Sequence, residues 1–374
     1  MFLALKEMKR AKVRFGLLMS AIGLLVFLIL TQQALQDGLL TGFVGAIERQ
    51  SAPVIVYSVD GQRTLQGSTI TPPLQKKIEA VDGVAASGRI GQGTFTATID
   101  GGDQTDVAII GYDDPDLGAP DKLSAGRLPR TDREAVGSST DFSVGSKVTV
   151  VPPDPGAKPV VFTVVGLADD VQIQVTPTLF TRWAGYEAAV LASNPDATAV
   201  LPNAIGTRPA AGVTDQELVT RINDASLEAD ALTRQQAADE APGVVQVRQS
   251  FQVIFLLYGL VVPLVTGLFF LIITFQKSAS LTLLRAIGAR SSTLVRSLLF
   301  QVVLVMGGGI AIGVALYAPL SQLQVGSIAL RFNLGAVLFW SALLLVLGLL
   351  SALASARRVL AIDPIEATVG GGGR

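Results

Sequence analysis

Long apolar runs at both ends of the chain flank a more polar middle part. Four runs contain no Asp, Glu, Lys or Arg, at residues 15–33, 251–275, 298–319 and 332–355. A helix needs roughly 20 residues to cross the hydrocarbon core of a bilayer, and an unpaired charge there costs several kcal/mol. The pattern therefore predicts four transmembrane helices. The alternative, buried helices of a large soluble core, would need four helices without a polar face.

The basic residues predict how these helices are oriented. They cluster in residues 1–14, 276–297 and 356–374, and the positive-inside rule places all three segments in the cytoplasm. Residues 34–250, with 16 Lys and Arg against 27 Asp and Glu, then lie outside the cell membrane, as does the short connection near residues 321–331. The sequence predicts a multi-pass protein of a bacterial cytoplasmic membrane with both termini inside.

A cleavable signal peptide is the alternative for the first apolar run, because a basic segment precedes it. The run is longer than most signal-peptide cores, however, and no Ala-x-Ala-like site follows it. We favour an uncleaved membrane anchor.

The amino-acid composition of this 374-residue chain excludes several kinds of catalytic and metal site. Hydrophobic residues make up 49% and charged residues 16%, with a mean hydropathy of +0.50. There is no His and no Cys, which excludes catalytic sites and zinc sites built on these residues and leaves the redox compartment open. The sequence contains neither a P-loop nor a Gly-x-Gly-x-x-Gly motif, so we expect a partner to bind any ATP. We expect no catalytic residue, cofactor or metal in this chain.

Residues 34–250 show the pattern of a large α+β domain, in one or two subdomains. Thr71 before Pro72 predicts a helix start, and Thr214 with Glu217 forms a capping box for a helix that would run to about Ala231. Short β-branched runs predict strands at residues 54–59, 93–99, 107–111, 147–151 and 160–166, with a hairpin turn at 100–103.

The segment that leads into the second apolar run allows two interpretations. Thr233 and Gln236 form a second capping pattern, but Pro242 and Gly243 follow and would break the helix. The helix either resumes after Gly243 as a stalk that enters the membrane, or ends there in a flexible linker.

An acidic turn at residues 113–116 raises the question of calcium. Its three carboxylates fall short of a loop with alternating ligands and a final bidentate Glu. A solvated acidic turn is the favoured interpretation.

Two cytoplasmic segments carry motifs. The second loop reads Leu283-Leu284-Arg285-Ala286-Ile287-Gly288-Ala289-Arg290, and the chain ends near Asp363-Pro364-Ile365-Glu366-Ala367. Together with the order of the apolar runs, these motifs resemble the FtsX-like permease domain of MacB-type (type VII) ABC transporters. The middle part resembles the MacB-like periplasmic domain in ordered pieces at residues 107–111, 123–127, 132–136, 144–148 and 163–166. Residues 276–281 lack the acidic residue that is common in the family, which puts its usual ion pair with the ATPase in doubt.

The resemblance implies partners and site residues. Two copies of an ABC ATPase subunit, which would bind ATP and Mg, and a second copy of this chain are expected, together with membrane lipid and an external adaptor or hydrolase. Nothing indicates a nucleic acid partner. The residues expected to contact the ATPase are Leu283, Leu284, Arg285, Ile287, Gly288 and Arg290, with Asp363, Pro364 and Ala367 as a C-terminal motif. Alternatively, the loop forms a short helix on the inner membrane surface.

Gly309 and Gly313, in the third apolar run, form a Gly-x-x-x-Gly pattern that lets helix backbones approach closely. This contact could lie within one chain or between two copies.

Three functions remain open. The first is a permease that exports or extracts an amphiphile such as a lipid, a peptide or a drug, driven by the partner ATPase. The second is an FtsX-like signalling subunit that activates an external cell-wall hydrolase. The third is an amino-acid (glutamine) permease, which would normally carry a Glu-Ala-Ala…Gly…Leu-Pro loop that is missing here.

Overall fold

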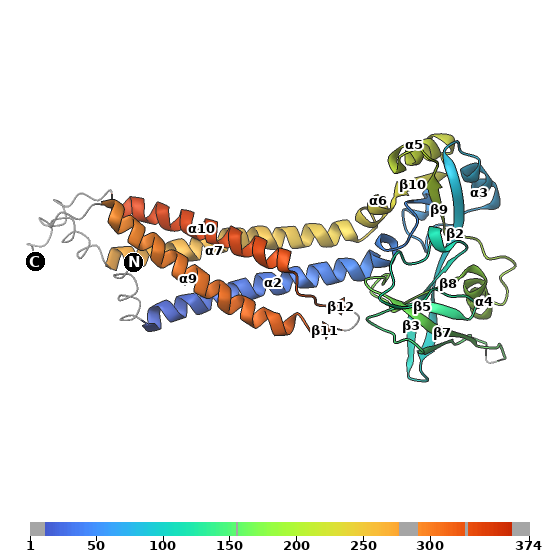
Figure 1. Cartoon of the computed structure of the whole chain (residues 1–374), viewed down its shortest axis with the longest axis horizontal. Coiled ribbons are helices and arrows are strands. Elements are labelled where there is room, and N and C mark those ends of the chain that lie inside the picture. Colours follow the sequence, from blue (N-terminus) through green and yellow to red (C-terminus); the bar gives the residue numbers. More distant parts are fainter. Residues whose placement is uncertain (1–11, 155, 277–290, 326–327, 361–374) are drawn as a thin grey trace, which may run out of the picture. The chain divides into compact units, whose positions relative to one another are not determined.

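The computed structural model describes residues 12–154, 156–276, 291–325 and 328–360 (Figure 1). Its internal contacts divide the chain into two compact units. We call residues 37–249, with the short segment 324–329, the inserted domain. The remaining residues form the helical unit.

Four long helices contain the predicted transmembrane segments. They are α2 (Lys12–Glu48), α7 (Val244–Gln276), α9 (Ser291–Leu320) and α10 (Leu334–Leu360). Each contains a stretch that is long and apolar enough to cross a membrane. The helices begin or end beyond most of the predicted runs, because polar residues continue the same helical hydrogen bonds after the apolar stretch ends. The strands β11 (Gln324–Val325) and β12 (Ile328–Ala329) form a hairpin between α9 and α10.

One face of each helix builds the core of the helical unit. On α2, Ile22, Val26 and Ile29 are buried at helical spacing, whereas Leu17 and Leu24 on another face are 68% and 61% exposed. Such exposure of large apolar side chains would be costly in water but carries no cost against lipid tails. The burial pattern therefore fits a helix bundle in a membrane.

The inserted domain is built on one ten-stranded sheet. Its path runs β10-β1-β9-β2-β3-β8-β5-β7-β4, and β6 pairs with both β2 and β7. The strands are β1 (Val54–Ser58), β2 (Val84–Ile99), β3 (Gln104–Tyr112), β4 (Ala125–Gly126), β5 (Glu134–Ser138), β6 (Lys147–Val150), β7 (Val160–Ala168), β8 (Thr178–Arg182), β9 (Ala204–Pro209) and β10 (Ala229–Thr233).

The first half of β2 belongs to a βαββαβ subdomain. Here β10, β1, β9 and β2 pair antiparallel in this order, with α3 (Pro72–Glu79) and α5 (Asp215–Ala225) as the crossover helices. This is the ferredoxin-like arrangement. Apolar residues of the two helices and the strands, among them Val56, Leu74 and Leu218, form one buried cluster.

The second half of β2 belongs to a barrel-like subdomain. The pairings β2-β3-β8-β5-β7-β6-β2 close a ring of six strands, two of whose pairings are parallel. The helix α4 (Trp183–Ser193) packs on it, and Tyr186 lies where a Cβ at Gly91 or Gly111 would be 2.3 Å from the tyrosine side chain. The β2–β3 turn at Asp100 and Gly101 has φ values of 51° and 76°, as a tight hairpin turn requires.

The predicted helix caps are confirmed. The Thr71 side chain accepts a hydrogen bond from Leu74 N, and both predicted capping boxes, at Thr214 and Thr233, are complete. The helix after Thr214 is shorter than predicted, however. It ends at Ala225 instead of about Ala231, because residues 229–233 pair along β1 as β10 and this tertiary pairing overrides the local preference for helix.

Besides α3, α4 and α5, the inserted domain contains the short helix α6 (Arg234–Asp239) and the turns η1 (Val59–Gly61) and η2 (Pro115–Leu117). The predicted fold class is confirmed: the described residues contain four helices of membrane-spanning length, with a large α+β domain between the first and the second.

Candidate functional site

The predicted ATPase-contacting residues lie outside the described residues. Leu283, Leu284, Arg285, Ile287, Gly288 and Arg290 fall in the gap 277–290, and Asp363, Pro364 and Ala367 fall in 361–374. Their roles stay predictions. The described part of the chain contains the packing glycines, the start of α7 and a groove in the inserted domain.

Gly309 and Gly313 on α9 lie against α2 of the same chain. A Cβ at Gly309 would lie 2.6 Å from Ile22 Cγ2, and one at Gly313 would lie 2.6 Å from the Val26 side chain. Gly23 on α2 packs equally closely against α9, since a Cβ added there would lie 2.8 Å from Ile312 Cγ2. Of the two packing interpretations, the structure shows the intrachain contact. Close backbone packing of this kind replaces the hydrophobic effect as the main attraction between helices in lipid.

We expect Gly313→Leu to lower the thermal unfolding midpoint of the detergent-purified chain, because overpacking a tight contact costs about 1–3 kcal/mol. Gly307→Leu on the same helix is the matched control, since nothing lies within 4 Å of a Cβ at Gly307. Equal loss of stability in both variants would contradict the proposed importance of the α2–α9 contact.

The start of α7 decides between the two interpretations of residues 233–250. The helix α6 ends at Asp239, Gly243 has a φ of +88°, and α7 begins at Val244. The Gly243 amide donates to Gln246 Oε1 at 3.1 Å, and Arg248 Nη2 donates to Asp239 Oδ1 at 2.8 Å. The helix therefore resumes after Gly243 and continues through the predicted second span to Gln276.

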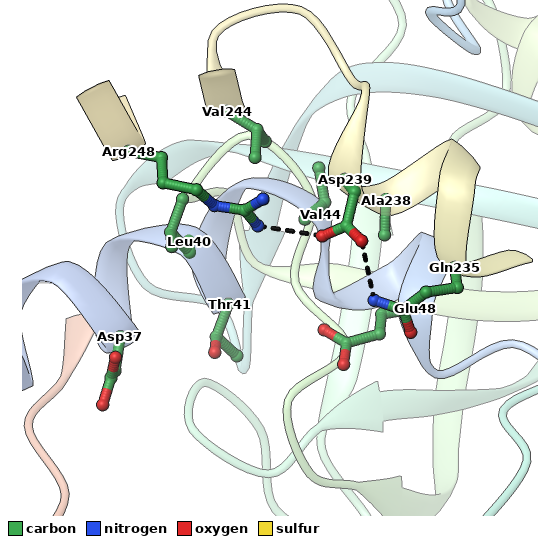
Figure 2. A pocket seen from close by; sticks show the side chains of 10 residues that line it. All are labelled: Asp37, Leu40, Thr41, Val44, Glu48, Gln235, Ala238, Asp239, Val244 and Arg248. Carbon is green, nitrogen blue, oxygen red and sulfur yellow. Dashed lines mark hydrogen bonds and ion pairs between the residues drawn. The ribbon is translucent and has the colours of Figure 1, made fainter. Parts of the chain in front are cut away.

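A groove of about 300 Å³ lies beside this junction, within the inserted domain (Figure 2). One part of its lining is apolar, and the other part carries charged and polar groups. Its lining residues are Asp37, Leu40, Thr41, Val44, Glu48, Gln235, Ala238, Asp239, Val244 and Arg248. Sequence analysis did not predict it, because its walls come from α2, α6 and α7, which are far apart in the sequence.

Some of the polar groups of the groove form hydrogen bonds with each other. Asp239 accepts hydrogen bonds from Arg248 and, at 3.0 Å, from Gln235 Nε2, and the Arg248 guanidinium holds the pKa of the Asp239 carboxyl below its usual value. The groove offers an apolar wall beside charged groups, which suits contact with an amphiphile or a protein segment. Among the described residues, no cluster of His, Cys, Asp or Glu could hold a metal ion.

The carboxylates of the acidic turn bind protein groups, and the Asp113 and Asp116 side chains are 34% and 75% exposed. Asp113 receives two hydrogen bonds from the Arg89 guanidinium, at 2.6 and 3.0 Å, and Asp114 caps the turn η2 by accepting from Asp116 N. Asp116 lies 3.5 Å from Arg208. Each carboxylate thus has a protein partner of its own.

The pieces that resemble the MacB-like domain meet in the fold. Arg127 forms a bidentate ion pair with Glu134, at 2.8 and 2.6 Å. Gly166 on β7 lies so close that its Cβ would be 2.4 Å from Arg127 O. Three separate pieces of the sequence therefore build one structural contact at the β4–β5–β7 edge, rather than a ligand site.

This contact makes stability depend on pH. Arg127, together with the Arg130 and Thr131 amides, lowers the pKa of Glu134 from 4.5 to about 2. A carboxyl with a lowered pKa in the folded state stabilises that state above its ordinary pKa, and this contribution disappears as the pH falls toward the folded-state value. We expect Glu134→Gln to lower the thermal midpoint at pH 7, and the difference from wild type to shrink between pH 4.5 and pH 2.

The control is Asp132→Asn, which removes an exposed carboxylate 3.6 Å from Arg182. A Glu134→Gln effect that stays constant from pH 7 to pH 3 would contradict this origin of the stabilisation.

Comparison with known proteins places the chain among transporters. No family model matches it. It is 25% identical, over 376 residues and 99% of both chains, to HrtB of Staphylococcus haemolyticus, a permease protein named for a hemin transport system. It is also 23% identical to an uncharacterised ABC transporter permease of Mycobacterium tuberculosis, Rv0072, over 98% of this chain and 99% of that one.

Solved structures resemble about half of the chain. The periplasmic region of MacB from Actinobacillus actinomycetemcomitans aligns with a TM-score of 0.35 and 10% identity, covering 50% of this chain and 92% of that one. The extracellular domain of the ABC-type transporter YknZ from Gram-positive bacteria aligns with a TM-score of 0.31 and 14% identity, covering 48% and 99%. The full-length relatives, together with four long apolar helices in the described residues, indicate a multi-pass membrane protein similar to ABC transporter permeases, which is consistent with the resemblance to the MacB type.

Proposed function

We propose that this chain is the permease subunit of an ABC transporter that exports or extracts an amphiphilic substrate, and that a separate ATPase subunit supplies the energy. The observation that carries the proposal is similarity to ABC permeases from end to end of the chain. The absence of any nucleotide-binding motif in the sequence is consistent with ATP and Mg binding in the partner.

In this proposal the loop around residues 283–290 is cytoplasmic and lies in a groove of the ATPase. Leu283, Leu284 and Ile287 would present an apolar ridge to that groove, with Arg285 and Arg290 at its edge. Two permeases and two ATPases would form the working assembly. Closure of the ATPases on ATP would move the loops, then the helices, and finally the inserted domain outside the membrane, as a rigid-body transition.

We expect the double substitution Leu284→Asp and Ile287→Asp to abolish co-purification with the ATPase from cells. Each carboxylate would enter an apolar groove at a cost of about 1–3 kcal/mol. Thr282→Asp adds one carboxylate on the opposite side of the helix that this proposal assumes for the loop, and we expect it to leave the complex intact.

Unchanged co-purification of the double variant would place the docking site elsewhere. The same experiment tests the orientation, because a loop outside the cell could not meet a cytoplasmic ATPase.

Hemin is a candidate substrate because the relative from Staphylococcus haemolyticus is named for its transport. Iron in haem proteins is bound by His, Cys, Met or Tyr, and this chain has no His and no Cys. Tyr57 and Tyr112 are buried in the inserted domain, and burial raises the pKa of Tyr112 to about 12, which opposes a phenolate ligand. We propose that recognition rests on the amphiphilic shape of a substrate, without a His or Cys ligand to its iron.

Proteoliposomes that contain the permease and its ATPase test the function. We expect ATP-dependent loss of hemin from the membrane, and similar loss of iron-free protoporphyrin, because the two molecules share the flat apolar ring and the two propionates. A strict requirement for iron would contradict amphiphile recognition. Stimulated ATP hydrolysis without movement of any amphiphile, but with activation of an added cell-wall hydrolase, would favour the signalling function instead.

A further inference from the structure

The segment that joins β7 to β8, residues 169–177, runs along the last turns of α2. Three main-chain hydrogen bonds join the two. Val175 N donates to Gly42 O at 2.7 Å, Gln174 N donates to Phe43 O at 3.1 Å, and Ala46 N donates to Gln172 O at 2.9 Å. The Ala46 amide and the Gly42 carbonyl, four residues apart on α2, both bind the neighbouring segment.

Glycines on α2 make this approach possible. A Cβ at Gly45 would lie 2.2 Å from Asp170 O, closer than any side chain can stand to a backbone atom. At Gly42 the nearest atom is Val175 Cγ2, at 3.3 Å, which is tight but involves only a side chain. The two positions therefore differ sharply in what an added methyl group would displace.

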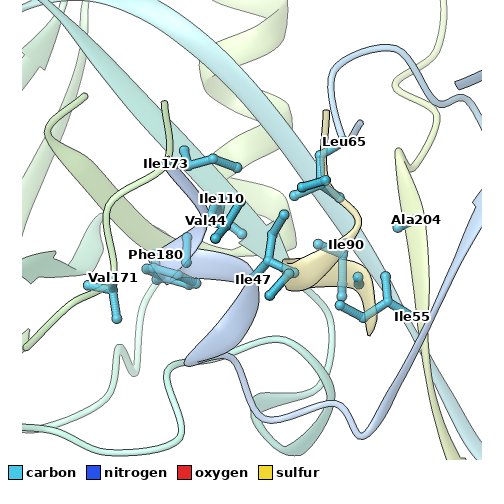
Figure 3. Close-up of a cluster of buried hydrophobic side chains, with 14 of the residues drawn as sticks. Val44, Ile47, Ile55, Leu65, Ile90, Ile110, Val171, Ile173, Phe180 and Ala204 are labelled. Carbon is cyan, nitrogen blue, oxygen red and sulfur yellow. The ribbon is translucent and has the colours of Figure 1, made fainter. Parts of the chain in front are cut away.

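Apolar side chains of residues 169–177 and of α2 also pack against each other. Val171 and Ile173 of the segment are 1% and 4% exposed, and they belong to the cluster that includes Val44 and Ile47 of α2 and Phe180 of β8 (Figure 3). The segment is thus anchored to the sheet and to α2 at once.

The turn at the tip of the segment is strained. Gln174 and Val175 have φ values of 53° and 57°, between the bridged residues Ile173 and Thr176. Two successive left-handed residues usually require Asn-Gly or Gly-Gly, and a β-branched residue in this region is an outlier. The amides of these two residues are the ones that bind α2. Their unfavourable conformation is therefore maintained by the contact with the helix.

We propose that residues 169–177 form a releasable clamp that passes movement of α2 to strands β7 and β8, with the strain at Val175 keeping the clamp close to release. The proposal rests on the proposed function, in which α2 carries the first membrane span. Release of this contact would break the three main-chain hydrogen bonds and the apolar packing, and it would let Gln174 and Val175 leave the left-handed region. The released arrangement is the second state that the proposed switching element needs.

Hydrogen–deuterium exchange of the full-length chain in detergent, without the ATPase, tests the clamp itself. We expect Gly45→Ala to speed exchange in peptides covering residues 42–47 and 172–176 by about tenfold, because the added methyl group forces the segment away. Gly42→Ala is the matched control with the same gain in helix preference, and we expect exchange close to wild type.

Val175→Gly provides a test that does not depend on a damaging substitution. Glycine adopts the left-handed conformation without steric strain, and the greater backbone entropy that it loses offsets only part of this gain, so we expect exchange of residues 172–176 to slow several-fold. Equal exchange in Gly45→Ala and Gly42→Ala, or unchanged exchange in Val175→Gly, would overturn the clamp, whatever the function of the protein.

The complex with the ATPase tests the role in coupling. With a non-hydrolysable nucleotide, we expect exchange in residues 172–176 to change in the wild type and to change less in Val175→Gly, whose clamp cannot open readily. A nucleotide response elsewhere in the permease with none in residues 172–176 would overturn the coupling role. Failure to bind any ATPase would instead refute the proposed function while the exchange results on the isolated chain still decide whether the clamp exists.

Discussion

Hydrocarbon excludes unpaired charge, and the rest of this structure follows from that constraint. The four apolar runs carry none of the 59 charged residues. Of the 30 acidic residues, 27 lie in residues 34–250, whereas in the rest of the chain 13 basic residues face only 3 acidic ones. Backbone groups in lipid must also be satisfied within the segment, which leaves helices as the solution for single runs. The chain therefore separates into a helical unit and an inserted domain, each with its own buried clusters.

The hydrophobic effect does not drive helices together in lipid, so another attraction must hold the bundle together. Here close packing of helix backbones supplies part of that attraction. Gly23, Gly309 and Gly313 bring α2 and α9 together where a Cβ would overlap the neighbour. Glycines also allow close packing inside the inserted domain. Gly91 and Gly111 admit the Tyr186 ring against the sheet, and Gly45 admits the β7–β8 segment against α2. Many glycines of this chain therefore serve close packing, as others serve turns.

The inserted domain is suited to pass on movement because its elements are shared. The strand β2 pairs with β9 through its first half and with β3 through its second, so it belongs to both subdomains. The helix α2 ends in this domain, where residues 42–46 bind the proposed clamp, and α7 begins in it, where the Asp239–Arg248 ion pair spans Gly243. Rigid elements joined by few, specific contacts are the kind of arrangement in which two discrete states can exist.

Local signals in the sequence determined the four membrane helices, the caps at Thr71, Thr214 and Thr233, and the Asp100–Asp103 turn, because each depends on residues close together in the chain. The Gly309-x-x-x-Gly313 pattern likewise indicated a packing surface, but only the tertiary structure showed that α2 is its partner. Strand β10, the closed ring of six strands, the groove and the clamp were beyond sequence reasoning for one reason. Each is decided by pairing between distant segments, which turned Ala229–Thr233 into a strand and keeps Val175 in a conformation that its own side chain disfavours.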